Sequence, residues 1–320
     1  MEISPGLHRI EAPLGARYVA VYLVVGEDAA LMVDTGVDDS IATTVAPYLS
    51  SIGLPPERVR YIVSTHSDFD HVGGNAAMKD LSPQALLMCG EDDRRMVGDV
   101  EAMIADRYGE FADEHGFSET DESEAFIRSV TRTAPVDIGL RGGERIDLGS
   151  RIVEILHTPG HSWGHLSVLD VESQSLMIGD AVLGNGLLTA DGEPAFPPTY
   201  RYVDTYRGTI ARLAALAPSS VLTSHYPVYA GTAGTDFLAE SLAYTDRVEA
   251  TILRALRESG TPLGVLDIIG ANHQDLGAWS ADAAQLLVYP VLGHVEALVA
   301  RGTVVRDADS AGRARYKAVR

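Results

Sequence analysis

Cationic side chains are scarce in this chain of 320 residues. Lys and Arg together number 25 against 45 Asp and Glu, so the formal net charge at pH 7 is −20. Proteins that bind nucleic acids or anionic membranes neutralise phosphate groups largely with Lys and Arg. The composition therefore disfavours nucleic acids and membranes as partners of the whole chain and favours an enzyme that acts on a small-molecule substrate.

Cysteine and long apolar runs are also nearly absent. Cys89 is the single cysteine, so no disulfide can form within the chain, and it follows a strand-like segment, as a buried structural thiol would. No apolar run reaches the length of a membrane span, and the first residues have neither the basic segment nor the apolar core of a signal peptide. We therefore expect a cytoplasmic protein.

Four potential metal ligands, by contrast, lie within six positions of one stretch: His66, Asp68, Asp70 and His71. A short apolar run precedes them, and two glycines after them allow a tight turn into a helix, so the ligands lie on a loop between a strand and a helix. The alternative interpretation of this stretch alone is a polar, aspartate-rich turn in which the histidines have no role.

Three further apolar strands lead into a histidine or an aspartate. The strand at 151–156 precedes the loop with His161, the strand at 175–178 precedes Asp180, and the strand at 220–224 precedes His225. Strand ends at one edge of a sheet lie close together, so side chains far apart in the sequence can converge there. Together the four strand ends predict one metal site.

Strands and helices alternate along the chain, which predicts a layered α/β architecture. The expected strands lie at 6–12, 18–25, 29–34, 59–64 and 85–89, and the expected helices at 39–51, from 74, and at 204–216. Residues from about 91 to 130 form an acidic helical insertion. Its Met and aromatic residues are either the buried side of solvated helices or an apolar wall of a pocket.

These motifs resemble those of the metallo-β-lactamase superfamily, whose loop reads His-x-His-x-Asp-His and is followed by a distant His, a distant Asp and a final His. The resemblance covers about residues 6–235 and includes the segments 34–36, 66–74, 158–165, 179–180 and 224–225. It implies a four-layer αβ/βα sandwich with a dinuclear metal site at one edge. By position it implies His66 and His161 as ligands of the first ion, Asp70, His71 and His225 as ligands of the second, and Asp180 as the bridge.

Asp68 departs from the family pattern, which has a second histidine at this position. With Asp68, Asp70 and Asp180 ionised, three negative charges face two divalent cations, and one hydroxide brings the sum to zero. Such an anionic site tolerates iron or manganese better than a site of nitrogen ligands does. We expect two divalent ions, zinc first and iron or manganese as alternatives, with Asp68 either as a direct ligand or reached through water.

The resemblance and the expected ions imply a hydrolase in which a metal-bound hydroxide cleaves a thioester, an ester or a lactone. Asp70 would transfer a proton, and the hydroxyl of Tyr226 either donates to a developing oxyanion or only packs. Asp34 is either a turn residue or an acceptor that orients metal ligands, and His165 supports the site without binding an ion. An iron-dependent oxidative enzyme, motivated by Asp68, and a nuclease are the alternatives.

A second domain is expected over residues 237–320, after a catalytic domain over residues 1–236. Three helices and a hairpin follow one another there, an order that resembles a winged helix. The last twenty residues are basic, as nucleic-acid binding requires, but the stretch 283–299 has no Lys or Arg and contains Pro290. We favour a module that walls the pocket or mediates a homodimer.

Overall fold

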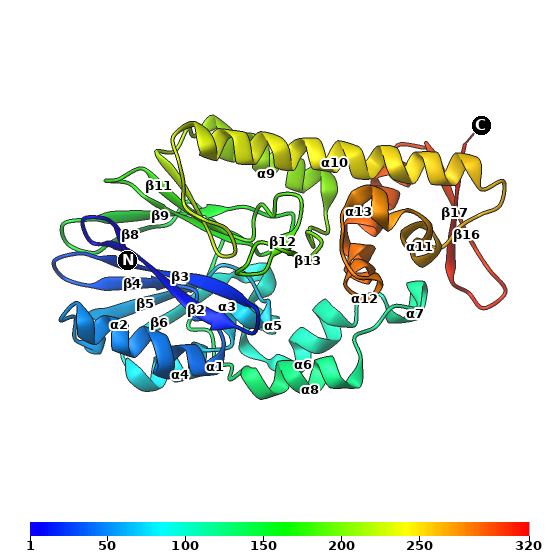
Figure 1. The fold of residues 1–320 in the computed structure, drawn as a ribbon. Helices are drawn as coiled ribbons and strands as arrows, with labels where there is room; N and C mark the ends of the chain where they lie inside the picture. The colour runs from blue at the N-terminus through cyan, green and yellow to red at the C-terminus, as the bar shows by residue number, and fades with distance from the viewer. Residues whose placement is uncertain (320) are drawn as a thin grey trace.

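Two β-sheets packed face to face form the centre of one half of the molecule in the computed structural model, which describes residues 1–319 (Figure 1). Residue 320, the last of the expected second domain, lies outside the described residues. The first sheet has the strand order β1 (Glu2–Ser4), β2 (Leu7–Leu14), β3 (Arg17–Val25), β4 (Ala30–Val33), β5 (Val59–Ser64), β6 (Leu86–Gly90) and β7 (Ile138–Leu140). Strands β4 to β7 are parallel neighbours because helical segments connect them.

The second sheet has the strand order β15 (Tyr229–Ala230), β14 (Ser220–Thr223), β11 (Ser175–Gly179), β10 (Leu166–Asp170), β9 (Ile152–His157) and β8 (Arg145–Asp147). Apolar side chains of both sheets fill the space between them, among them Tyr22 and Leu31 from the first sheet and Ile155, Val168 and Leu222 from the second. Burying each large apolar side chain contributes about 1.5–3 kcal/mol. This shared layer holds the two sheets together.

Helices cover the outer face of each sheet, which confirms the predicted αβ/βα sandwich. On the first sheet, one continuous helical segment made of α1 (Asp38–Ser40), η1 (Ile41–Val45) and α2 (Ala46–Ser51) packs beside α4 (Asn75–Leu81). The π-helical turn η1 precedes Pro47, which has no N–H group to donate within the helix. On the second sheet, α9 (Val203–Ala215) and α10 (Thr232–Glu258) form the outer layer.

The acidic segment between β6 and β7 is helical, as expected. Its elements are η3 (Glu91–Asp93), α5 (Arg94–Gly98), α6 (Val100–Met103), η4 (Ile104–Tyr108), α7 (Ala112–His115) and α8 (Asp121–Val130). Apolar side chains such as Val97 and Met103 pack against Cys89, while acidic ones such as Glu101 and Asp113 are exposed. Cys89 is therefore the buried thiol that the sequence predicts, and burial raises its pKa.

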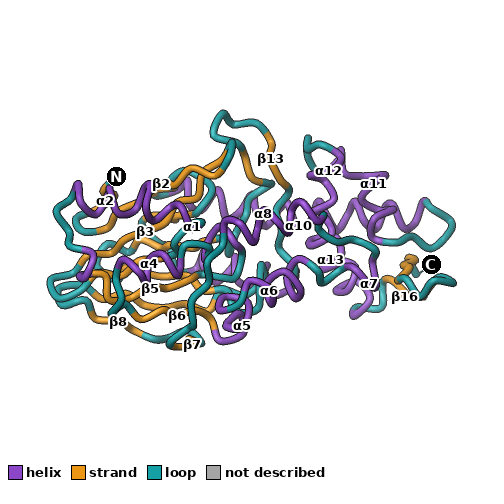
Figure 2. Tube along the Cα trace, turned by 90° about the horizontal axis from the view of Figure 1, so that it is seen from below, coloured by secondary structure: helices purple, strands orange, loops and turns teal. Residues whose placement is uncertain are grey.

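The C-terminal module consists of the end of α10, α11 (Val265–Leu276), α12 (Ala281–Ala284), η5 (Gln285–Leu287), α13 (Val288–Ala300) and the hairpin of β16 (Val304–Ala308) and β17 (Ala314–Ala318). Figure 2 shows the insertion helices α6 and α8 between the sandwich and this module. The expected boundary at residues 236 and 237 falls inside α10, which runs along both parts (Figure 1). One apolar cluster contains Ile178 and Tyr206 of the sandwich and Leu292 of α13, so the core is continuous across that position.

One helical segment within residues 1–319, Ala281–Ala300, is long and apolar enough to cross a membrane. The expectation that no apolar run reaches that length is therefore wrong for this segment. Its most apolar window is 67% buried, and α13 packs against α9, α10 and α11. Pro290 is accommodated near the start of α13, directly after the 3₁₀ turn η5. A helix at the core of a folded domain passes the same length and composition test, and the burial fits that explanation.

Substituting Leu292→Ala tests the continuous core. Leu292 is 2% exposed in the shared cluster, and removing a buried leucine side chain costs about 2–5 kcal/mol. We expect thermal unfolding to remain a single transition at a lower Tm, because sandwich and C-terminal module unfold together.

Leu216→Ala is the matched control, since Leu216 is 43% exposed at the end of α9 and its loss should cost less than about 0.5 kcal/mol. A separate early transition of the C-terminal helices in Leu292→Ala would contradict the continuous core.

Candidate metal centre

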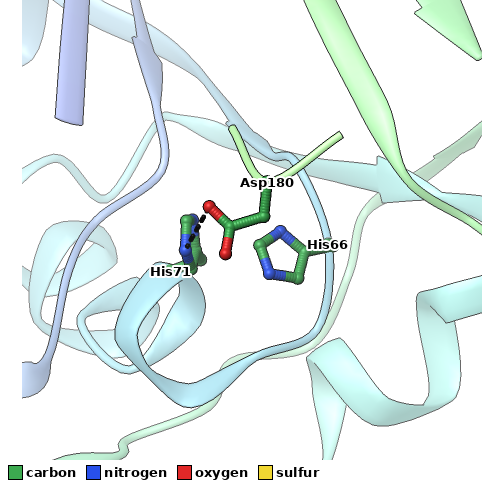
Figure 3. Close-up of side chains that lie close together, drawn as sticks. All are labelled: His66, His71 and Asp180. Atoms are coloured by element: carbon green, nitrogen blue, oxygen red, sulfur yellow. Dashed lines mark ion pairs between the residues drawn. The ribbon is translucent and has the colours of Figure 1, made fainter. Parts of the chain in front are cut away.

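The structure brings all seven expected ligands together at one edge of the sandwich. His66 and Asp68 follow β5, and the short helix α3 (Phe69–Val72) carries Asp70 and His71. The loop between β9 and β10 carries His161, and the segments after β11 and β14 carry Asp180 and His225. Figure 3 shows His66, His71 and Asp180 pointing toward one another. The four strand ends singled out in the sequence therefore meet at one place in the fold.

His71, His225, Asp180 and Asp70 are spaced as ligands of one ion would be. The Nε2 atoms of His71 and His225 lie 3.4 Å apart, and Oδ1 of Asp180 lies 3.5 Å from the first and 3.4 Å from the second. Oδ2 of Asp70 lies 3.6 Å from Nε2 of His225. Two ligands at about 2.1 Å from a tetrahedral ion lie about 3.4 Å apart. This group, called the second-ion group below, fits a divalent cation.

Buried atoms without partners support that fit. Oδ1 of Asp180 and Nε2 of His66 are buried and accept no hydrogen bond from any described residue. Buried polar atoms in native proteins nearly always have a partner. An ion held among these side chains would satisfy Oδ1 of Asp180, and His66, His71 and Asp180 present ligand atoms within 4.8 Å of one another.

Asp34 holds His71 in the orientation that the ion requires. Its carboxylate accepts hydrogen bonds from the backbone N–H of Thr65 at 2.7 Å and from the Thr65 hydroxyl at 2.9 Å, and it lies 2.8 Å from Nδ1 of His71. Nδ1 therefore carries the proton, and Nε2 is free to bind. Asp34 also has a φ of 61°, a strained value that Asp tolerates better than most residues. Asp34 is therefore both a turn residue and an acceptor that orients a metal ligand.

The charges around the second-ion group favour a cation. Burial lowers the pKa of His71, but Asp180, Asp34 and Asp70 outweigh burial and raise it to about 10. Burial likewise lowers the pKa of His225, and Asp180 and Asp70 raise it above its ordinary value. A divalent ion would take the place of these protons, since histidine binds metals in its neutral form.

Arg107 enters the first-ion group, which consists of His66, Asp68 and His161. Its Nε donates to Oδ1 of Asp68 at 2.9 Å, and its Nη2 lies 3.3 Å from Oδ2 of Asp68 and 3.1 Å from Nε2 of His161. Burial raises the pKa of Asp68, but the Arg107 guanidinium and His161 hold it well below its ordinary value. Asp68 is therefore an ionised partner of Arg107.

The ligand atoms of the first-ion group also lie within 4.8 Å of one another, but this group faces an arginine side chain. Oδ2 of Asp68 lies 2.9 Å from Nε2 of His161, a hydrogen-bond distance, and both atoms also face the guanidinium of Arg107. The expected charge sum of zero counted three carboxylates, two divalent ions and a hydroxide, and it left out this arginine. With Arg107 included, the same sum is +1.

Reasoning from the sequence missed Arg107, although a signal was present. Arg107 belongs to η4 and is 5% exposed, and its neighbours three or four positions away, Met103, Ile104 and Phe111, are buried. A single arginine on the apolar side of an acidic helix needs a buried anion to pair with. That requirement pointed to a carboxylate elsewhere in the fold but could not tell which one.

A cavity of about 670 Å³ opens above the metal centre. Asp68, Asp70, Arg107, Asp180 and His225 form its polar end. Its walls are largely apolar and come from the insertion, from β12 (Leu187–Leu188) and β13 (Pro194–Phe196), and from the C-terminal module; they include Tyr108, Phe117, Phe126, Ile127, Leu187, Phe196, Leu286 and Tyr289. The apolar-wall interpretation of the insertion and the pocket-wall interpretation of the C-terminal module are both confirmed.

The comparisons with known proteins agree with this geometry. A family model described as the metallo-beta-lactamase superfamily matches residues 14–225, more than half of the chain. The chain belongs to the metallo-beta-lactamase superfamily. The matched region begins in β2 and ends at His225, so it contains every expected metal ligand.

Relatives within the superfamily share low identity with the chain. Human acyl-coenzyme A thioesterase MBLAC2 is 27% identical over 233 residues, which cover 68% of this chain and 75% of that protein. Hydroxyacylglutathione hydrolase of Pseudomonas aeruginosa is 28% identical over 192 residues, 59% of this chain and 55% of that protein. The crystal structure of the metallo-beta-lactamase family protein TTHA1429 from Thermus thermophilus has a TM-score of 0.77 and 22% identity, and the match covers 99% of this chain and 100% of that one. That shared fold includes the C-terminal module.

Two other residues singled out in the sequence, His165 and Tyr226, are neighbours of the ligands but do not line the cavity. His165 is buried, its Nε2 accepts from the backbone N–H of Asp180 at 3.2 Å, and its Nδ1 lies 2.9 Å from the hydroxyl of Thr158. The hydroxyl of Tyr226 donates to the backbone carbonyls of Leu183 and Gly186. His165 thus positions Asp180, as expected. Tyr226 packs, and its geometry does not support the role of donor to an oxyanion.

Asp34→Asn tests the support of His71. Asparagine tolerates the positive φ and keeps the size of the side chain, but it removes the carboxylate that accepts from His71. We expect zinc affinity to fall by about 10- to 100-fold, measured by competition with a chelator, while the fold is retained.

Asp170→Asn is the matched control. Asp170 is fully buried and lies 3.4 Å from Nε of Arg151, at the opposite end of β10 from His165. Its substitution should leave zinc affinity unchanged. Equal affinities for wild type and Asp34→Asn would show that Asp34 does not orient a ligand.

Proposed function

We propose that this protein is a metal-dependent hydrolase that cleaves acyl thioesters with an apolar acyl group. One observation carries the proposal: the second-ion group lies at the polar end of a cavity whose walls are largely aromatic and aliphatic. A volume of about 670 Å³ is typical of pockets that enclose a small molecule. A substrate with one polar reacting carbonyl and one apolar chain matches this division of the cavity.

The chemistry at the polar end follows from the ligand set. A divalent ion held there acts as a Lewis acid and depresses the pKa of a bound water from about 16 towards about 7. Asp70 lines the cavity and is the carboxylate placed to accept a proton from the attacking water and to pass it to the leaving group. Asp34 and His165 keep His71 and Asp180 in place. Zinc is the ion we propose first, because histidine nitrogens and carboxylate oxygens are its common ligands.

We propose thioesters ahead of other carbonyl substrates because of two relatives of the chain. The names of human MBLAC2 and of the Pseudomonas hydrolase both denote cleavage of an acyl thioester. A thiolate leaves more readily than an alkoxide, so such a substrate demands less of the group that protonates the leaving atom. We propose esters and lactones with a similar acyl part as secondary substrates of the enzyme.

The other two functions considered lose support. The iron-dependent oxidative enzyme rested on Asp68 making the site more anionic, and Arg107 balances that charge. Nucleic-acid binding rested on the basic C-terminal residues, and several of these pair with acidic residues of the chain itself: Arg301 with Glu249, Arg306 with Glu114, and Arg315 with Asp267 and Asp309. A cytoplasmic enzyme with a small-molecule substrate is the proposal that agrees with the charge and the cavity.

A hydrolysis panel tests the function. Zinc-loaded protein is assayed with acyl thioesters of increasing chain length, with esters, lactones and a phosphodiester. We expect turnover of thioesters with a long acyl chain, and loss of at least about 1,000-fold in kcat/KM in His71→Ala combined with Asp180→Ala, because the ion is no longer held. Turnover restricted to the phosphodiester, or full thioesterase activity in the double variant, would contradict the proposal.

The same panel on Ala283→Trp tests the role of the apolar wall. Ala283 lines the cavity from α12, so the indole ring would shorten the space for the acyl chain. We expect KM for long-chain thioesters to rise by about tenfold while acetyl thioesters are unaffected. Ala281→Trp is the control, since Ala281 is exposed on the same helix and is not part of the cavity. Equal chain-length profiles for the two variants would place the acyl chain elsewhere.

A further inference from the structure

The two halves of the metal centre differ in what surrounds their ligand atoms. In the second-ion group, the Nε2 atoms of His71 and His225 and Oδ1 of Asp180 are 3.4–3.5 Å apart, and no lysine or arginine of the described residues is recorded in contact with them. In the first-ion group, Nε2 of His161 lies 2.9 Å from Oδ2 of Asp68, and the guanidinium of Arg107 donates to Asp68 and lies 3.1 Å from Nε2 of His161. Histidines and carboxylates line both groups, but the first-ion group already contacts a guanidinium, whereas the second-ion group is free to bind a metal ion.

Arg107 contacts the atoms that a first ion would need. Its planar fork meets both carboxylate oxygens of Asp68, the bidentate geometry that arginine prefers with a carboxylate. Its Nη2 also lies 3.1 Å from Nε2 of His161. An ion between Asp68 and His161 would have to displace these contacts and share the space with a permanent positive charge.

Arg107 cannot easily move away from this position. It is 5% exposed, its guanidinium lies 4.4 Å from the centre of the Tyr289 ring, and its backbone carbonyl accepts a hydrogen bond from the Tyr289 hydroxyl at 3.1 Å. Its Nη1 also lies 3.5 Å from the backbone carbonyl of His161. The π-helical turn η4 that carries it packs through Ile104 and Tyr108 in the apolar cluster of the insertion. If the Arg107 side chain moved away from Asp68, each of the two partners would be left with an uncompensated buried charge.

The charges also balance with a single divalent ion. Asp68 is neutralised by Arg107, which leaves Asp70 and Asp180 as the carboxylates of the second-ion group. Their two negative charges match one divalent cation. With a second divalent ion and one hydroxide the sum is +1, so only loss of the Arg107 charge would bring a two-ion centre back to zero.

We infer that Arg107 takes the place of the first metal ion, so that the chain binds one divalent ion, at Asp70, His71, Asp180 and His225. The guanidinium holds Asp68 and His161 together and supplies the positive charge on that side of the cavity. His66 then faces the single ion as well, since its ligand atom lies within 4.8 Å of those of His71 and Asp180 and its Nε2 makes no hydrogen bond to any described residue. The metal centre is mononuclear, although its ligand residues match a dinuclear pattern.

Metal content is measured on the full chain without substrate, so the result does not depend on the proposed thioesterase activity. Metal-free protein is dialysed against zinc and analysed for zinc per chain, and it is titrated with cobalt(II) while the visible absorption is recorded. Wild type should bind one ion per chain, with a cobalt titration that ends at one equivalent. Two tightly bound ions per chain in wild type would overturn the inference.

Arg107→Met and the double variant Asp68→His with Arg107→Met test the cause. Methionine keeps a flexible apolar stem without the charge, and the histidine restores the family ligand, so the double variant leaves no unpaired buried carboxylate. We expect a second ion in both, bound more tightly in the double variant. Should Arg107→Met fail to fold, the double variant and the wild-type count still decide, and one ion per chain in the double variant would overturn the inference.

Arg201→Met is the matched control for removing a buried arginine. Arg201 is 6% exposed and pairs with Glu110 and Glu296, away from the ligand atoms. This variant should still bind one ion per chain. A second ion in Arg201→Met would show that loss of a buried arginine elsewhere also allows a second ion to bind, and that Arg107 does not specifically exclude it.

Discussion

The ion pair between Arg107 and Asp68 connects three parts of the chain that lie far apart in the sequence. Arg107 belongs to the insertion, Asp68 and His161 belong to loops of the sandwich, and Tyr289 of the C-terminal module packs on the guanidinium. Removing one partner of a buried ion pair costs about 3–5 kcal/mol, because the other charge is left without compensation. The pair therefore fixes the insertion over the metal centre, and with it one wall of the cavity.

The pair also explains why the two halves of the metal centre are unequal. His71 is held by Asp34 and surrounded by carboxylates, so its half attracts a cation. Asp68 already has a cation, and this cation belongs to the protein. A guanidinium stays in place whatever metal is available, whereas an ion must be acquired. Asp68 and Arg107 are thus two parts of one feature, because the guanidinium binds the carboxylate in a bidentate pair and neutralises it.

Much of the fold and most of the site could be predicted from the sequence, because each ligand follows an apolar strand and strand ends meet at a sheet edge. His66, Asp70, His71, His161, Asp180 and His225 were found in this way, and Asp34 was recognised as a possible support. Arg107 was not, since its apolar neighbours indicate only that it needs a buried anion and do not identify a partner 39 positions away. For Tyr226 the sequence left open whether its hydroxyl donates to an oxyanion or only packs, because the direction of the hydroxyl depends on the distant carbonyls of Leu183 and Gly186. The predicted boundary at 236 and 237 lies within α10, a helix that contributes to one apolar cluster with both the sandwich and the C-terminal module, and no local sequence feature indicates that continuity.

The number of metal ions per chain and the position of Arg107 are tested most directly by a crystal structure of the zinc-loaded protein, with anomalous diffraction data collected on both sides of the zinc absorption edge. A single ion predicts one anomalous peak per chain, within about 2.0–2.2 Å of ligand atoms of Asp70, His71, Asp180 and His225, with the guanidinium of Arg107 still on Asp68. Two peaks per chain about 3.5–4 Å apart, with Arg107 turned away from Asp68, would contradict it.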